Sequence, residues 1–186
     1  MSSGARTISV PWTRRVLALL AGGMVAAVAA GCSDSREYAV PDTVCETPAD
    51  ADLLAPLLPN GDAFEQKRSN FGEESWSCRL QVDKALVLYV KGDVVPADVD
   101  PIKVKEEALG RMGHPEKADI GDDARVADQG ALAVVACPRP NDERKFVMEI
   151  ESMSDTPKDT SERRQALSRF LDSYLTQALK AQGCPS

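Results

Sequence analysis

Alternation of apolar and polar residues gives the clearest structural signal along this chain. From Trp76 to Val82, apolar residues occupy every second position, and polar residues lie between them (Ser77, Arg79 and Gln81). A period of two is typical of a strand with one buried face. The run Ala85–Val90 is almost entirely apolar, and only Asp83-Lys84 separates it from the first run. The pattern therefore predicts a tight β-hairpin, followed by a loop from Gly92 to Asp100.

The second half of the chain carries the same kind of pattern. Residues Ala124–Ala127 and Ala131–Cys137 flank a turn at Asp128-Gln129-Gly130, which predicts a second hairpin. A last strand is predicted around residues 146–151, where one face would carry Phe146, Met148 and Ile150.

Helical periodicity predicts three helices. The first would start with Thr47 as its N-cap and Pro48 in its first turn, and its apolar face consists of Leu53, Leu54, Leu57 and Leu58. The second would start with Asp100 as its N-cap, and its apolar stripe consists of Val104, Ala108, Leu109 and Met112. The third and longest would run from about Thr160 to Gln182, behind a capping box formed by Asp159 and Glu162.

The N-terminal 31 residues have the layout of an export signal. Residues 1–15 hold three basic side chains and no acidic one, and Val16–Ala30 is an uncharged run of small and apolar residues. A membrane-spanning helix needs about 20 apolar residues, and this run has 15, with Gly22-Gly23 inside it. We therefore predict a signal peptide. Its paired arginines, Arg14-Arg15, fit either the general secretion route or the twin-arginine route.

The end of this segment, Ala29-Ala30-Gly31-Cys32, resembles the lipobox of bacterial lipoproteins. The resemblance implies that Cys32 receives a diacylglyceryl thioether and becomes the first residue of the mature protein, on the extracytoplasmic face of the cell membrane. Two or more acyl chains give a stable anchor. The alternative is a secreted protein without lipid. The predicted organisation is a signal peptide (1–31), a lipidated cysteine with a flexible tether (32–44, polar from Ser33 to Thr43), and one domain (45–186).

Four cysteines remain after the anchor: Cys45, Cys78, Cys137 and Cys184. In an exported chain they predict two disulfides, for which three pairings exist. We favour Cys45–Cys78 with Cys137–Cys184, because each bridge then stays within one half of the chain. No pair has C-x-x-C spacing and the chain has one histidine, so we expect no metal site and no cofactor.

These elements predict an α+β fold. We expect an antiparallel sheet of about four to six strands packed against helices, one long C-terminal helix and two disulfides. Loss of residues 1–31 moves the formal net charge from −7 to −10, with 19 basic against 29 acidic residues. Such an acidic surface is repelled by phosphate backbones, so nucleic acid is excluded as a partner.

The order Cys45, a short leucine helix, then Trp76-Ser77-Cys78 leading into a hairpin resembles a pattern in small actinobacterial, Streptomyces-like envelope lipoproteins of uncharacterised function. It covers roughly Cys45 to Val90. The resemblance implies an envelope-anchored α+β domain with a Cys45–Cys78 bridge, and it implies no catalytic residues.

Few residues suggest chemistry. His114 follows Gly113 in a predicted loop, and no motif for a nucleophile accompanies it. The acidic pairs Asp98/Asp100 and Asp122/Asp123 lack the spacing of a calcium loop, and capping explains them better. The remaining candidates have ordinary structural explanations: core positions for Trp76 and Tyr89, and the solvated side of the last helix for Arg163, Arg164 and Arg169.

The sequence therefore favours a monomeric, membrane-anchored protein with a non-enzymatic binding or accessory role. Its partner would be another protein, an envelope polymer or a small solute. A deep apolar pocket would favour a solute or lipid, and a flat apolar patch would favour a protein. The alternative is an envelope enzyme or enzyme inhibitor, which a cleft around His114 with a carboxylate in hydrogen-bond reach would support.

Overall fold

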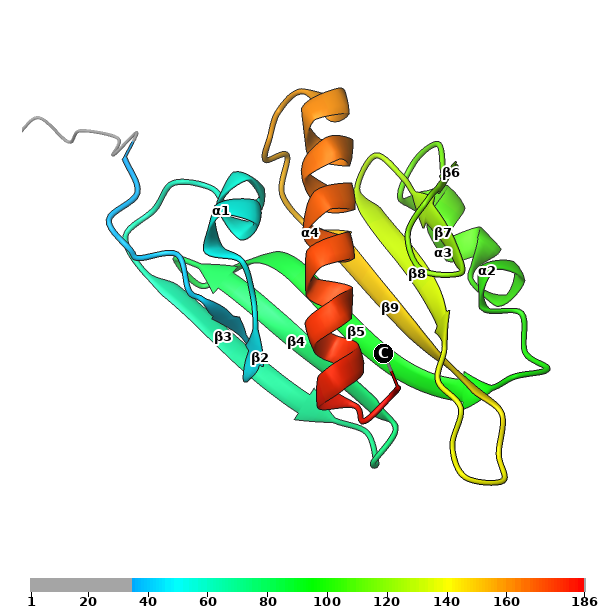
Figure 1. Cartoon of the computed structure of the whole chain (residues 1–186). Coiled ribbons are helices and arrows are strands. Elements are labelled where there is room, and N and C mark those ends of the chain that lie inside the picture. Colours follow the sequence, from blue (N-terminus) through cyan, green and yellow to red (C-terminus); the bar gives the residue numbers. More distant parts are fainter. Residues whose placement is uncertain (1–34, 186) are drawn as a thin grey trace, which may run out of the picture. The chain divides into compact units, whose positions relative to one another are not determined.

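A seven-stranded antiparallel sheet forms the centre of the molecule, in the order β3-β4-β5-β9-β8-β7-β6 (Figure 1). The computed structural model describes residues 35–185, so the predicted signal peptide and Cys32 lie outside the described residues. The strands are β3 (Phe64–Asn70), β4 (Ser75–Val82), β5 (Ala85–Pro96), β6 (Glu116–Ala118), β7 (Asp123–Val126), β8 (Gly130–Ala136) and β9 (Arg144–Ser152). The α+β class is confirmed, but the predicted number of strands, four to six, is too low.

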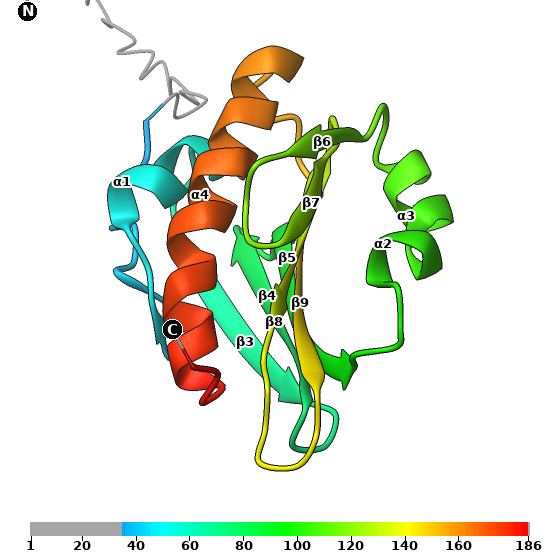
Figure 2. The same ribbon diagram turned by 45° about the vertical axis from the view of Figure 1, so that its right-hand side comes forward.

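Helices cover both faces of this sheet, which gives three layers (Figure 2). The long helix α4 (Thr160–Ala181) lies on one face together with α1 (Ala51–Leu54) and the 3-10 turn η1 (Ala55–Leu57). We call this the inner face. The opposite, outer face carries α2 (Pro101–Val104) and α3 (Glu106–Arg111), which pack mainly over β7, β8 and β9, while Val95 of β5 packs against the same cluster. Within residues 35–185, no helix lies over the outer surface of β3 and β4 (Figure 2).

The main core lies between the inner face and α4. The alternating residues of β4 point into it, as the period of two predicts, and Trp76, Cys78, Leu80 and Val82 are all buried. Helix α4 contributes Leu167, Phe170, Leu171 and Tyr174. Because α4 lies across several strands, its wide apolar face is buried along most of its length.

A smaller core lies under α2 and α3. Leu109 and Met112 pack there against Leu132, Val134 and Val147. The single helix predicted after Asp100 is wrong, because helical geometry breaks at Lys105 (φ −95°, ψ 4°) and separates α2 from α3. Asp100 caps α2 as predicted, but Val104 points to solvent and is 70% exposed.

The first helix also begins later than its sequence suggests. Thr47-Pro48 forms the short strand β2, which pairs with β1 (Thr43–Val44), and Asp50 is the true N-cap. The Asp50 carboxylate accepts hydrogen bonds from the backbone N–H of Asp52 (2.9 Å) and Leu53 (3.3 Å). A carboxylate satisfies these two free amide donors at a helix start.

The β4–β5 hairpin turns through Asp83 and Lys84, both with positive φ (50° and 69°). The Asp83 carboxylate accepts hydrogen bonds from the backbone amides of Asp62 and Ala63, which explains an aspartate at this turn. Strand β5 then continues to Pro96, so the predicted loop over Gly92–Asp100 is wrong for its first five residues.

Two disulfides tie the β1–β2 pair and the end of α4 to the sheet. Cys45, beside β1, pairs with Cys78 on β4, and Cys137, after β8, pairs with Cys184, after α4. This is the pairing that the sequence favours. The bridges join residues 33 and 47 positions apart, and loops of this length remove roughly 3–4 kcal/mol of unfolded-state entropy each on the chain-entropy model.

The predicted tether is wrong from Arg36 onward. Arg36 donates to the carbonyl oxygens of Ala55 (2.8 Å) and Leu58 (2.5 Å), and the Tyr38 ring stacks on Phe64 with 5.6 Å between centroids. Arg36, Tyr38 and Val40 are partly buried, whereas the residues between them are exposed. This alternation of buried and exposed positions was not visible in the sequence, because most residues of the segment are polar. We call residues 36–40 the strap, and the domain therefore begins before residue 45.

Candidate functional site

An apolar groove of about 340 Å³ opens on the outer face, beside α2. One wall comes from the β3–β4 turn and the start of β4, the floor from β5 and β9, and the other wall from α2 and the loop before it. Its lining is mostly apolar and includes Phe71, Val95, Val99, Val104 and Val147, and the charged residues Glu74, Asp93 and Lys105 also line it. We call this the groove.

Two large apolar side chains at the groove are exposed to solvent. Phe71 is 63% exposed on the β3–β4 turn, and Val104 is 70% exposed at the end of α2. Single exposed apolar residues are ordinary on a protein surface. Here two of them line the same hollow from separate elements, which is the arrangement of an interaction site rather than of scattered surface residues.

The local structure explains why the groove stays open. Helices α2 and α3 lie mainly over β7, β8 and β9, and the helix break at Lys105 ends α2 with Val104 exposed to solvent. The β3–β4 turn carries Phe71 at the other side, where the Phe71 N–H donates to the Ser75 carbonyl (2.7 Å). The turn therefore has a defined backbone geometry.

A charged hollow of about 430 Å³ lies farther along the same two strands, beside α3. Lys105 lines both this hollow and the groove. The Glu149 side chain is only 6% exposed, and its Oε2 lies 2.9 Å from Lys105 Nζ and 3.7 Å from Lys91 Nζ. Two ammonium groups thus surround one buried carboxylate, which compensates the cost of its desolvation.

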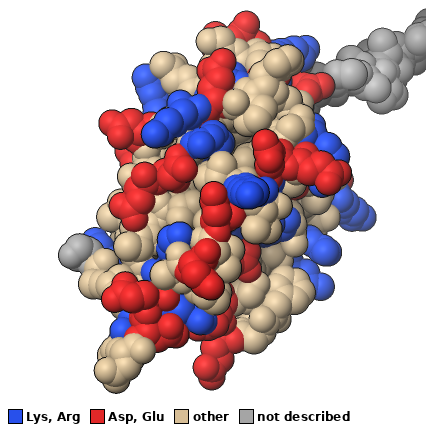
Figure 3. Space-filling view, turned by 90° about the vertical axis from the view of Figure 1, so that its right-hand side faces the viewer, with Lys and Arg blue, Asp and Glu red and all other residues tan. Residues whose placement is uncertain are grey.

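Charge over this side of the molecule is mixed. Figure 3 shows lysine and arginine interleaved with aspartate and glutamate around apolar and uncharged areas, rather than one large acidic or basic patch. This face therefore has no single-sign patch that would select one class of charged partner, although the net charge of the protein is negative. Local shape and apolar contact therefore matter more here than net charge.

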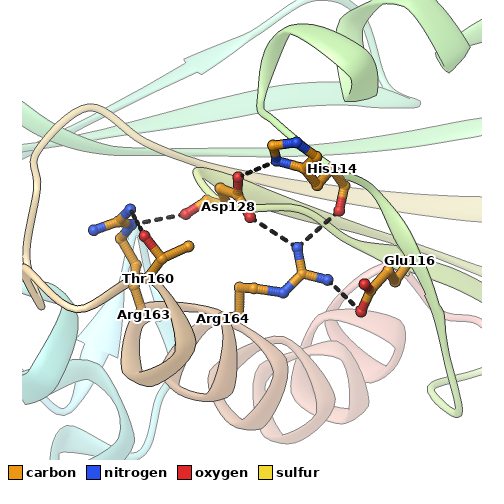
Figure 4. Close-up of polar contacts among 6 residues, drawn as sticks. All are labelled: His114, Glu116, Asp128, Thr160, Arg163 and Arg164. Atoms are coloured by element: carbon orange, nitrogen blue, oxygen red, sulfur yellow. Dashed lines mark hydrogen bonds and ion pairs between the residues drawn. The ribbon is translucent and has the colours of Figure 1, made fainter.

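His114 does have a carboxylate in hydrogen-bond reach (Figure 4). Its Nδ1 lies 2.7 Å from Asp128 Oδ2, and Arg164 donates to Asp128 Oδ1 (2.9 Å) and to the His114 carbonyl (2.7 Å). The same guanidinium pairs with Glu116. The hydrogen bonds from His114 and then from Arg164 hold the pKa of Asp128 below its ordinary value, although its burial opposes this shift.

This cluster has the geometry of a structural ion-pair network and not of a catalytic site. A catalytic His–carboxylate pair would present the free ring nitrogen to a nucleophile inside a cleft. Here the His114 side chain is 88% exposed, and Asp128 is shared with Arg164, a permanent cation. The ion pairs join the loop before β6, the β7–β8 turn and the first turn of α4 (Figure 4).

Arg163 lies in the same region but is buried, so its predicted place on the solvated side of the last helix is wrong. It donates to the carbonyl oxygens of Asp128 (2.7 Å) and Pro157 (2.6 Å). Carbonyl acceptors allow a guanidinium to be buried without a carboxylate partner. The prediction is also wrong for Arg164, whose side chain is 18% exposed and pairs with Asp128 and Glu116. Arg169 is exposed, as predicted.

The other residues suggested by the sequence have structural roles. Trp76 is in the core, 3% exposed, whereas Tyr89 is partly exposed on β5, where Lys91 Nζ lies 4.8 Å from its ring centroid. The Asp122 carboxylate accepts from the Ala136 amide, and Asp123 pairs with Arg125. Cys32 lies outside the described residues.

The groove itself was missed by sequence reasoning. Phe71 is a lone aromatic in a polar turn, and Val104 was assigned to a buried stripe. Glu149 and Lys105 are 44 residues apart, and only the fold brings them together. The single local signal was Glu149, a charged residue inside the buried run 146–150 of β9.

Comparison with protein-family models, curated proteins and solved structures finds no significant match for this chain. Across residues 35–185, no helix combines the length and the apolar character that crossing a membrane requires. Function therefore has to be inferred from the groove, the charged hollow and the strap.

Proposed function

We propose that this protein is a lipid-anchored envelope lipoprotein with a non-enzymatic binding role, and that the groove is its binding site. The proposed occupant is a segment of another extracytoplasmic protein that contributes an apolar side chain to the groove. The observation that carries this proposal is the pair of exposed side chains, Phe71 and Val104, on opposite walls of one apolar hollow.

The shape of the groove favours a protein over a small solute. Small-molecule sites enclose most of their ligand's surface, whereas this groove is a shallow hollow that opens along the outer face. Its walls come from a turn and a short helix rather than from a barrel or a deep cleft. A protein segment can cover Phe71 and Val104 from outside, while a small solute would leave both exposed.

The charged hollow would add specificity. Lys105 stands between the groove and Glu149, so a bound segment that reaches past α2 meets an ammonium group next to the apolar floor. Charged groups at the rim of an interface contribute more to partner choice and association rate than to affinity. We expect a partner with an apolar anchor and an acceptor group beside it.

Burial of Phe71 and Val104 would contribute enough binding free energy for a hot spot of the interface. Full burial of a Val or Phe side chain contributes about 1.5–3 kcal/mol, and these two start more than half exposed. Together they would supply about 2–4 kcal/mol, which corresponds to roughly a 30- to 1,000-fold change in Kd. A few central residues of this kind dominate most interfaces.

The test uses substitutions in the lipidated protein in its own envelope. A photo-cross-linking amino acid in place of Phe71 identifies the partner, and the Kd of that partner is then measured for Phe71→Asp and Val104→Asp. We expect each substitution to weaken binding at least tenfold without lowering the unfolding midpoint, because both side chains are exposed.

Met153 provides the matched control. It is 44% exposed and lies outside the groove, so Met153→Asp makes the same chemical change elsewhere. The proposal fails if Met153→Asp weakens binding as much as the groove substitutions, or if neither groove substitution changes the Kd. A ligand mass retained by the Cys32→Ser protein in native mass spectrometry would support solute binding instead.

A further inference from the structure

The strap fixes the point at which the domain can be attached to a membrane. Within the strap, the Glu37 amide donates to the Gly61 carbonyl (2.9 Å), and the Tyr38 hydroxyl donates to the Pro59 carbonyl (2.5 Å). With the two bonds from Arg36, the strap is fastened to η1 at Ala55 and to the segment that joins η1 to β3. The chain upstream of Arg36 therefore leaves from this segment.

Only three residues separate Cys32 from Arg36. At no more than about 3.6 Å per residue, the α-carbons of Cys32 and Arg36 lie at most about 14 Å apart. A fully extended tether over Ser33 to Thr43 would instead have reached about 35–40 Å by the same measure. Fastening of the strap shortens the reach of the anchor by more than half.

The attachment point and the groove lie at opposite ends of the sheet. The segment held by the strap adjoins the β4–β5 turn, where Asp62 contacts Asp83. Phe71 lies on the β3–β4 turn, at the other end of both strands. Strand β4 alone has eight residues, or about 23 Å between its ends. Figures 1 and 2 both place the entry of the described chain and the β3–β4 turn at opposite extremes of the sheet.

We infer that the strap holds the domain directly against the membrane, with the β4–β5 turn toward the lipid head groups and the groove facing away from them. The partner of this end of the sheet is the bilayer surface, and contact with it is enforced by the short linker. This inference rests on the proposed lipidation of Cys32. It also deepens the proposed function, because a groove that faces outward is presented to a protein and not to the membrane.

Charge does not cause this orientation. The end near the strap carries three exposed acidic residues, Glu37, Asp62 and Asp83, against one exposed lysine, Lys84, so anionic head groups repel it on balance. The short linker opposes that repulsion because the covalent lipid contributes far more binding free energy than a few surface charges. Release of the strap would let the domain move away, so the hydrogen bonds of Arg36 and Tyr38 set the distance.

The first experiment tests the strap without any lipid. In the Cys32→Ser protein, hydrogen exchange of the Glu37 amide is compared with that in a variant that also carries Arg36→Ala and Tyr38→Ala. We expect a protected amide in the first and at least tenfold faster exchange in the second. Exchange of Glu37 at the rate of an unstructured chain in the Cys32→Ser protein overturns the inference at this step.

The second experiment measures orientation on liposomes. Lys84→Cys, on the β4–β5 turn, and Glu73→Cys, on the β3–β4 turn, are two exposed positions for a donor dye. With an acceptor dye on the head groups, we expect clearly stronger energy transfer from position 84 than from position 73. Twenty Gly/Ser residues inserted between Ser33 and Asp34 should abolish this difference, because they add about 25 Å of flexible chain.

Each outcome has one meaning. Equal transfer from both positions with the native linker overturns the orientation while leaving lipidation intact. A protein that fails to bind liposomes, and whose Cys32 carries no acyl mass, overturns the proposed lipidation and the orientation together. In that case the exchange experiment still decides whether the strap is fastened.

Discussion

Lys105 and Glu149 form an ion pair that connects the break between α2 and α3 to the outer surface of β9, with 2.9 Å between Nζ and Oε2. The Glu149 side chain is buried, but the Lys105 side chain is about one-third exposed. Glu149 on the sheet thus holds Lys105, the residue at the helix break, in place. The same pair separates the groove from the charged hollow, so its geometry controls the shape of both.

We predict that Lys105→Met destabilises the protein more than Glu149→Gln does. The first change leaves a buried carboxylate with only Lys91, 3.7 Å away, whereas the second leaves two lysines that can turn to solvent. Loss of one partner from a fully buried pair costs 3–5 kcal/mol, and partial exposure here lowers our expectation to about 1–2 kcal/mol. Urea unfolding of both single variants and of the double variant measures this difference and the coupling.

A result with equal losses, or with no coupling in the double variant, would show that the pair does not stabilise the helix break. Glu107→Gln is the control, since Glu107 pairs with Arg111 on an exposed helix surface. Exposed pairs of this type contribute about 0.3–0.5 kcal/mol.

Asp128 predicts an acid dependence of stability. Its hydrogen bonds to His114 and Arg164 lower the pKa of its carboxyl below the ordinary value of 3.8. A lowered pKa in the folded state means that the carboxylate stabilises the fold above the unfolded pKa, and that this contribution disappears as pH falls through the folded pKa. We therefore expect the wild type to be more stable than Asp128→Asn above about pH 4, and the difference to shrink below it.

Urea midpoints of both proteins between pH 2 and pH 7 measure this difference. Glu116→Gln removes an exposed contact of the same arginine and should show a much smaller effect. A constant difference between wild type and Asp128→Asn across the whole pH range would contradict the role assigned to this ion-pair cluster.

Tyr174 leads to the opposite prediction, that the protein loses stability at alkaline pH. Its hydroxyl is buried and donates to the Val44 carbonyl (2.8 Å), and burial raises the pKa of Tyr174 to about 12. Since the ordinary value is 10.0, unfolding releases a proton between pH 10 and pH 12, and stability falls over that range. Tyr174→Phe lacks this titration. We expect it to be about 1 kcal/mol less stable than wild type at pH 7, and the difference to vanish or reverse near pH 12.

Chemical unfolding at pH 7, 10 and 11.5 tests the sign. Tyr89→Phe serves as the control, because the Tyr89 ring lies partly exposed on the outer face of β5. If Tyr174→Phe and wild type lose stability in parallel above pH 10, the Tyr174 hydroxyl is not the group that titrates on unfolding.

Periodicity predicted the elements that face a core from one side. The alternation around Trp76 gave β4, and the apolar face that includes Phe170 gave α4, because burial on one face imposes a period on the sequence. Strand β3 lacks this signal: it is an edge strand in which charged residues such as Glu65 and Lys67 discourage pairing with other chains. The strap was missed for a different reason: Arg36 and Tyr38 are polar residues that carry no apolar period, and they pack on the domain because their polar ends bond its backbone carbonyls.

The site was harder to predict than the fold. Capping explained the starts of α2 and α4 because Asp100 and Asp159 act on neighbouring amides. The groove depends on Phe71 and Val104, which come from separate elements and lie together only when the sheet has formed. Local sequence therefore specifies caps and strands here, whereas tertiary packing specifies the site.

Gly92 gives the last prediction, because its place in β5 depends on the ring of Trp76 across the strand pair. A Cβ atom built on Gly92 would lie 2.5 Å from the nearest Trp76 ring atom. Trp76 is buried between this backbone and the Arg68 guanidinium, which lies 4.7 Å from the ring centroid. Gly92→Ala must therefore displace a core tryptophan, and we expect a loss of about 1–3 kcal/mol in unfolding free energy.

Gly110→Ala is the matched control for this change. Gly110 lies within α3, and a Cβ atom there meets nothing within 4 Å. Because alanine is favoured over glycine inside a helix, this variant should gain about 0.5–1 kcal/mol. Urea unfolding followed by Trp76 fluorescence measures both variants. If Gly92→Ala is as stable as wild type and leaves the emission unchanged, the close approach of Gly92 to the indole does not constrain the core.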